Sequence, residues 1–210
     1  MIPGPKTYHA HVAWGLMEAD RIVPGRRYGE AALAHIRWVL SHQKPNGWFK
    51  NCDLNMPERP LTHTLGYVLR GVTEAYLFSP DPEFLKASCL TANALLGVMK
   101  EDGYIAGRFF ENWQPADHWV CLTGTVQIAI CWLLLYQITG DVAYRDAAIL
   151  ANRYVRRQMS VNGPPYMRGG IKGAYPVNGH YGTYSYPNWA CKFFIDSNIL
   201  EARAGWIDLH

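Results

Sequence analysis

Side chains of the kinds that act on sugars gather in polar stretches of this sequence. Asp117 and His118 stand next to each other, Tyr184 lies in a Gly/Tyr-rich stretch, and His63 opens an apolar run. Glycoside hydrolysis uses a carboxyl group as acid beside the scissile bond. A uronate lyase needs a Tyr or His that removes a proton next to a carboxylate. We therefore predict Asp117, His118 and Tyr184 as catalytic residues, with His63 in support.

The same stretches supply residues that suit sugar binding. Arg and Lys pair with a uronate carboxylate, aromatic rings offer an apolar face, and acidic or amide side chains bond hydroxyl groups. The predicted substrate-binding residues are Trp48, Asp53, Arg108, Glu111, Trp113, Arg168, Lys172, His180, Tyr181, Asn188 and Trp189.

Each of these residue types also has a structural use. Loop carboxylates commonly cap helices, and Asp117 is placed to cap a helix that begins near Cys121. A loop Trp also plugs the base of its loop, and a lone His is often a hydrogen bonder. Arg70 and Glu74 are four residues apart, which favours an ion pair on one helix face.

Composition excludes several classes of protein. The chain has 210 residues with 49% apolar and 18% charged residues, which predicts one folded domain over residues 1–210. A net charge of +3 without a basic block predicts no nucleic-acid partner. The five cysteines form no CxxC pair, which argues against a disulfide framework and a zinc site. No metal and no cofactor are predicted.

The N-terminal residues lack the charged-then-apolar pattern of a signal peptide, and the apolar run at 126–136 is too short to cross a bilayer. We therefore expect a cytoplasmic protein without a membrane span.

An internal repeat of nearly sixty residues organises the chain. Turn pairs recur as Asn46-Gly47, Asp102-Gly103 and Asn162-Gly163, each after a helical pattern. Asp81 and Asp141 are also sixty residues apart and suit the N-cap of a helix. Each repeat therefore predicts a pair of helices with a short turn between them.

One-sided helical patterns alternate with patterns that are apolar on more faces, which indicates an outer and an inner layer of helices. The predicted inner helices are 7–20, 61–78, 123–138 and 188–203, and the predicted outer helices are 27–42, 81–98 and 141–158. The turns that lead from an inner helix to the following outer helix are short. The loops 44–60, 100–120 and 159–187 are long, so we expect all three at one end, around one mouth.

Several segments resemble known helical-ring proteins. The alternating hairpins and the stretch "QKPNGWF" resemble the (α/α) toroids, which include six-hairpin glycosidases, polysaccharide lyases and terpenoid cyclases. The segments "LTHTLGYVLRG", "CLTGTVQIAI" and "YPNWACKFFID" resemble uncharacterised bacterial toroid proteins linked to polysaccharide metabolism. The predicted fold class is therefore all-α, with helical hairpins in a partial (α/α) toroid.

The resemblance implies an enzyme, a glycoside hydrolase or polysaccharide lyase acting on a bacterial polysaccharide or a uronate-containing oligosaccharide. A non-catalytic glycan- or protein-binding module is the first alternative. A terpenoid-cyclase-like enzyme is the second, although its DxDD motif is absent. The sequence holds about three and a half hairpins, fewer than a complete toroid. The chain is then the C-terminal part of a longer toroid, a reduced fold, or part of a homo-oligomer that completes the ring.

Overall fold

Helices dominate the computed structural model, which describes residues 3–207 and the side chains of residues 3–205. The helices are η1 (Thr7–His9), α1 (Ala10–Ile22), α2 (Tyr28–Leu40), α3 (Thr62–Phe78), α4 (Pro82–Val98), α5 (Leu122–Thr139), α6 (Val142–Arg156) and α7 (Asn188–Ile207). Two short strands, β1 (Val120–Cys121) and β2 (Ala174–Tyr175), complete the set. The predicted inner and outer helices are all present, with ends shifted by a few residues.

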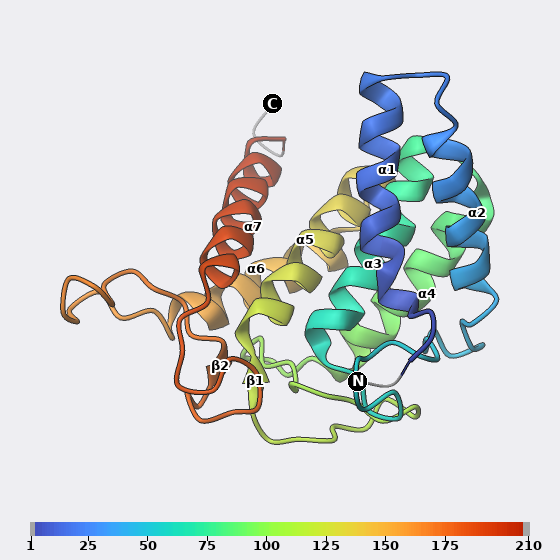
Figure 1. The fold of residues 1–210 in the computed structure, drawn as a ribbon. Coiled ribbons are helices and arrows are strands. Elements are labelled where there is room, and N and C mark those ends of the chain that lie inside the picture. The colour runs from blue at the N-terminus through green and yellow to red at the C-terminus, as the bar shows by residue number, and fades with distance from the viewer. Residues whose placement is uncertain (1–2, 208–210) are drawn as a thin grey trace.

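The helices form two layers, as predicted. Helices α1, α3, α5 and α7 pack against one another in that order and make the inner row. Helix α2 packs on α1, α4 on α3, and α6 on α5, so each hairpin adds one outer helix (Figure 1). This arrangement confirms the expected all-α, partial (α/α) toroid architecture.

Local signals explain where the outer helices begin. The Asp81 side chain accepts a hydrogen bond from the Glu83 amide at 3.0 Å, and Asp141 accepts one from the Ala143 amide at 3.0 Å. Pro82 occupies the first position of α4, where its missing amide proton costs nothing. The two N-caps predicted from the repeat are therefore confirmed.

The first two repeated turns pack in the same way against the next hairpin. Gly47 and Gly103 both adopt a positive φ, and a Cβ on either would clash with the backbone carbonyl of Leu90 or Leu150. Those two contact residues are themselves sixty positions apart. The third turn differs, because Gly163 is not among the glycines with positive φ.

Helix α5 is the centre of the fold. Residues 122–136 of this helix are all buried, because α3, α6 and α7 surround it. By length and composition α5 is the one helix in the described part of the chain that could cross a bilayer, yet 83% of that window is buried inside the protein. Its apolar surface is therefore used in packing against the other helices.

The three long loops lie at one end of the helices, as predicted (Figure 1). A bridge between Leu61 and Arg108 joins the first loop to the second. Strand β1 pairs antiparallel with β2 and joins the second loop to the third. The loops thus form one connected layer over the ends of the inner helices.

Candidate functional site

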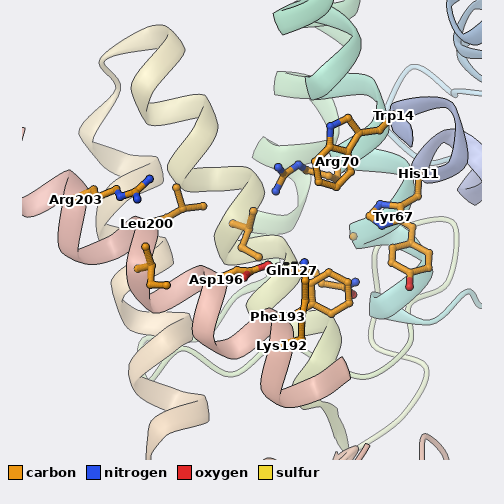
Figure 2. A pocket seen from close by; sticks show the side chains of 13 residues that line it. His11, Trp14, Tyr67, Arg70, Gln127, Lys192, Phe193, Asp196, Leu200 and Arg203 are labelled. Atoms are coloured by element: carbon orange, nitrogen blue, oxygen red, sulfur yellow. Dashed lines mark ion pairs between the residues drawn. The ribbon is translucent and has the colours of Figure 1, made fainter. Parts of the chain in front are cut away.

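The four inner helices line an open cavity of about 220 Å³ on their concave side. Figure 2 shows side chains from α1, α3, α5 and α7 turned toward this space. The lining residues are His11, Trp14, Gly66, Tyr67, Arg70, Gln127, Ile130, Lys192, Phe193, Asp196, Ile199, Leu200 and Arg203. Spaces between helices are a common place for a small ligand, although this cavity is smaller than the roughly 300–1,000 Å³ of most ligand pockets.

Aromatic rings form one wall of the cavity. His11 stacks on Tyr67 with a centroid distance of 4.1 Å and an interplanar angle of 15°. Phe193 meets both rings edge-on, at 6.4 Å from His11 and 6.3 Å from Tyr67. The Arg70 guanidinium lies 4.2 Å from the centroid of Trp14. These contacts tie α1, α3 and α7 together around apolar surface of the kind that packs against a sugar ring.

The charges around the cavity are mostly positive. Arg70, Lys192 and Arg203 face one carboxylate, Asp196, among the lining residues. Asp196 pairs with Lys192, which lies one helical turn before it. The Arg70 side chain pairs with Glu74 through Nε at 2.7 Å and Nη2 at 2.5 Å, as the sequence spacing predicted. Because Glu74 and Asp196 each pair with one of the three cations, the site carries one positive charge in excess, which suits an anionic ligand.

Two histidines at the site are held neutral. Burial, followed by the positive charge of Arg70, lowers the pKa of His11 from 6.5 to about 4. Burial also lowers the pKa of His63 to about 4, although a hydrogen bond with Gln127 opposes the shift. Perturbed titratable groups of this kind cluster at functional sites. At neutral pH both imidazoles therefore offer one donor and one acceptor.

His63 connects the cavity to the loops. Its ring lies 5.0 Å from Tyr181 and 4.4 Å from Tyr67, which lines the cavity. Trp189 donates a hydrogen bond from Nε1 to the Tyr181 hydroxyl at 2.8 Å, and half of Trp189 is exposed. The structure therefore brings together three residues predicted from the sequence, His63, Tyr181 and Trp189, next to the cavity.

The other predicted catalytic residues lie elsewhere in the loops. Asp117 is half-buried, with its Oδ2 atom 3.8 Å from Nε of Arg108. His118 and Tyr184 are exposed, and Tyr184 adopts a positive φ of 55°. Within the described chain, no hydrogen bond, ion pair or ring contact joins these three residues to one another. Their catalytic role stays a prediction, and they do not line the cavity.

Four predicted substrate-binding residues form the interior of the loop layer. Asp53 accepts hydrogen bonds from the amides of Asn55, Met56 and Leu61 and pairs with Nη1 of Arg108 at 3.1 Å. Trp48 packs edge-on against Trp113 at 5.4 Å, and only 2% and 7% of these residues are exposed. They support the loops from within, although Trp48 also lines a shallow, open pocket of the loop layer together with Lys44 and Glu111. Substrate binding by these residues stays a prediction that their burial does not favour.

The remaining predicted residues lie on or near the loop surface. Glu111 pairs with Lys44, and Arg168 donates to the Gly163 carbonyl. Lys172 lies 6.0 Å from the Tyr175 ring, and His180 lies 6.1 Å from Trp119. Asn188 is exposed at the start of α7. None of these side chains lines the cavity, and their roles also stay predictions.

Residue-by-residue reading of the loops missed most of the cavity. Several lining residues that lie within helices were not predicted from the sequence: Gln127, Lys192, Asp196 and Arg203. The available signal was Gln127, one of the few polar side chains of a mostly apolar helix. In the described part of the chain, no three His, Cys, Asp or Glu side chains gather closely enough to hold a metal ion.

No protein-family model matches the sequence, and no curated protein is similar enough to count as a relative. Solved structures do share the fold. A heparin-specific unsaturated glucuronyl hydrolase matches 98% of this chain and 61% of its own, with a TM-score of 0.78 and 16% identity. The unsaturated glucuronyl hydrolase of Bacillus sp. GL1 matches 92% of this chain and 57% of its own, with a TM-score of 0.74 and 14% identity.

The GH76 α-mannanase of Bacteroides thetaiotaomicron matches 95% of this chain and 53% of its own, with a TM-score of 0.68 and 16% identity. These similarities establish the fold of the (α/α) toroid glycosidases. The chain spans about 60% of the length of the glucuronyl hydrolases that it matches.

Proposed function

We propose that the cavity between the inner helices binds an acidic sugar residue, and that the protein is a carbohydrate-active enzyme. The reaction would be hydrolysis or β-elimination on a bacterial polysaccharide or a uronate-containing oligosaccharide. The observation that carries the proposal is the composition of the cavity, in which aromatic rings face Arg70, Lys192 and Arg203. A sugar ring would pack on the rings while its carboxylate meets the cations.

The shared fold supports this proposal. Unsaturated glucuronyl hydrolases and an α-mannanase are among the similar structures, and all of them act on sugars by their names. One of them is described as complexed with dGlcA-GalNAc6S, an oligosaccharide with an acidic terminal sugar. A terpenoid-cyclase-like activity fits less well, because a hydrocarbon substrate gains nothing from the cations.

A non-catalytic glycan-binding module is the second candidate, and one observation favours it. Glycoside hydrolysis commonly uses two carboxyl groups about 5–10 Å apart. Asp196 is the one carboxylate among the described residues that line the cavity, and it is paired with Lys192. A catalytic partner would have to come from outside this lining.

An activity assay distinguishes a lyase, a hydrolase and a non-catalytic module. The protein would be incubated with uronate polysaccharides and with unsaturated glucuronyl disaccharides. A rise in the ultraviolet absorbance of unsaturated uronates indicates a lyase. A fall in that absorbance, or new reducing ends without a rise, indicates a hydrolase. Binding without any of these changes favours the module, and no binding refutes the proposed function.

Location and assembly remain part of the proposal. All five cysteines are free thiols, and burial raises the pKa of Cys52, Cys121 and Cys131 to about 12, which suits a reducing cytoplasm. A homo-oligomer that completes the ring stays a prediction, and light scattering on the purified protein measures it.

A further inference from the structure

Two buried polar atoms at the cavity have no hydrogen-bond partner within the described chain. They are Nε2 of Gln127 and Nδ1 of His11, and both residues line the cavity. Gln127 is only 4% exposed. An unsatisfied buried polar group costs about 1–3 kcal/mol, so such atoms are rare and call for an explanation.

The Gln127 side chain is also fixed in its orientation. Nδ1 of His63 lies 2.7 Å from Oε1 of Gln127 and donates to it when the proton is on Nδ1. Gly66, three residues after His63 on α3, also packs against Gln127, and a Cβ there would come within 2.9 Å of the Gln127 Cβ and 3.3 Å of its Oε1. One end of the amide is therefore held by α3, and the NH₂ end is left for another partner.

We propose that Gln127 determines the specificity of the cavity by donating a hydrogen bond from Nε2 to an oxygen of the bound sugar. His63 is then a positioning residue, because it acts on the ligand through Gln127. This inference rests on the proposed function, since it takes a bound sugar as given. It also gives a role to the glutamine that α5, a mostly apolar helix, carries at the cavity.

The test is a double-mutant cycle with an unsaturated glucuronyl disaccharide as the probe, measured by calorimetry. Gln127→Met removes both amide functions at similar volume, and His63→Phe keeps a ring but removes the donor. We expect the Kd to rise about 5- to 20-fold in Gln127→Met and about 3- to 10-fold in His63→Phe. In the double variant the Kd should stay within about twofold of that of Gln127→Met, because His63 acts only through Gln127.

Stability should follow a different pattern, which separates this role from a purely structural one. Each single change strands one buried polar atom, whereas the double variant removes both partners and should regain much of the urea midpoint. The affinity of the double variant for the disaccharide should stay as low as that of Gln127→Met. Gln137→Met, at an exposed position of the same helix, is the matched control and should leave the Kd unchanged.

A Gln127→Met Kd within twofold of the wild-type value would overturn the inference while leaving the proposed function in place. If wild-type protein does not bind the probe, the proposed function fails and this inference fails with it. Should Gln127→Met not fold, ¹⁵N-glutamine labelling of the wild type replaces it. The probe should then shift one side-chain amide signal, and the absence of any shift would overturn the inference.

Discussion

Nδ1 of His63 and Oε1 of Gln127 lie 2.7 Å apart and join α3 to α5 beside the cavity. The contact links a residue at the loop end of α3 to the most buried helix of the fold. It also lies between two groups of rings, with Tyr181 on the loop side and Tyr67 on the cavity side. The hydrogen bond therefore ties the buried helix α5 to the residues around the cavity.

The buried histidines should make the protein less stable in acid. The folded-state pKa of His11 and of His63 is lowered from 6.5 to about 4. Above pH 6.5 both folded and unfolded forms are neutral, so the full stability is present. As the pH falls from 6.5 toward 4, the unfolded chain binds protons that the folded chain does not, and stability is lost.

Each lowered pKa corresponds to a loss of at most about 3 kcal/mol. Urea unfolding of the wild type at pH 7 and at pH 5 measures the part of this loss that falls above pH 5. His63→Phe should show a smaller difference between the two pH values than the wild type. His118→Phe, at an exposed loop position, should show the same difference as the wild type. An equal pH dependence in all three proteins would contradict the account.

Close packing of α1 on α3 should depend on Gly71. A Cβ at this position would lie 2.3 Å from the carbonyl oxygen of Ala10, one residue before the cavity residue His11. Gly71→Ala should therefore move α1 away and lower the free energy of unfolding by about 2 kcal/mol or more. Gly15→Ala on α1 meets nothing within 4 Å and should raise it by about 0.5–1 kcal/mol. Thermal unfolding of the two variants measures both effects, and equal melting temperatures would contradict this view of the helix contact.

The Asp53–Arg108 pair should stabilise the loops without contacting the ligand. Both side chains are buried, and Asp53 also accepts three backbone amide hydrogen bonds. Arg108→Met should cost about 3–5 kcal/mol because it leaves the Asp53 charge buried without its partner. Glu111→Gln breaks an exposed pair and should cost less than about 1 kcal/mol.

Calorimetric titration at a temperature where Arg108→Met remains folded then tests its predicted role in binding. A Kd equal to that of the wild type assigns Arg108 to the support of the loops. A Kd at least tenfold weaker would restore its predicted role as a substrate-binding residue.

The predicted catalytic residues are tested by two substitutions. Asp117→Asn and Tyr184→Phe change residues that lie outside the cavity lining. If the cavity is the reaction site, each variant should keep the rate of any measured glycan cleavage to within about threefold. A loss of about 100-fold or more, the size expected for a general acid or base, would show that the chemistry takes place in the loops.

The helices and their layers could be predicted because each leaves a local signal. Asp81 and Asp141 mark helix starts, the sixty-residue repeat sets the order of hairpins, and apolar periodicity separates inner from outer helices. The position of the long loops followed from the same alternation. These features depend on neighbours in the sequence, so one chain is enough to reveal them.

The cavity could not be predicted in this way. Its lining takes one or a few residues from each of four helices, and the rotation of each helix is set by packing contacts such as Gly66 against Gln127. Loop aromatics such as Trp48 look like binding residues in the sequence, yet the loops bury them to form their own interior. Of the predicted catalytic and substrate-binding residues, only His63, Tyr181 and Trp189 lie next to the cavity. The start of the first inner helix was also expected to reach it, and His11 and Trp14 do line it.

The most direct test of the account compares the Kd of an unsaturated glucuronyl disaccharide with that of its methyl ester, by calorimetry at low salt. The account predicts that the free acid binds at least about tenfold more tightly, because the ester loses the charge that meets Arg70, Lys192 and Arg203. A double variant that carries Lys192→Met and Arg203→Met should show a smaller difference in Kd between the acid and the ester. Equal affinity of the acid and the ester for the wild-type protein would contradict the claim that this cavity recognises an acidic sugar.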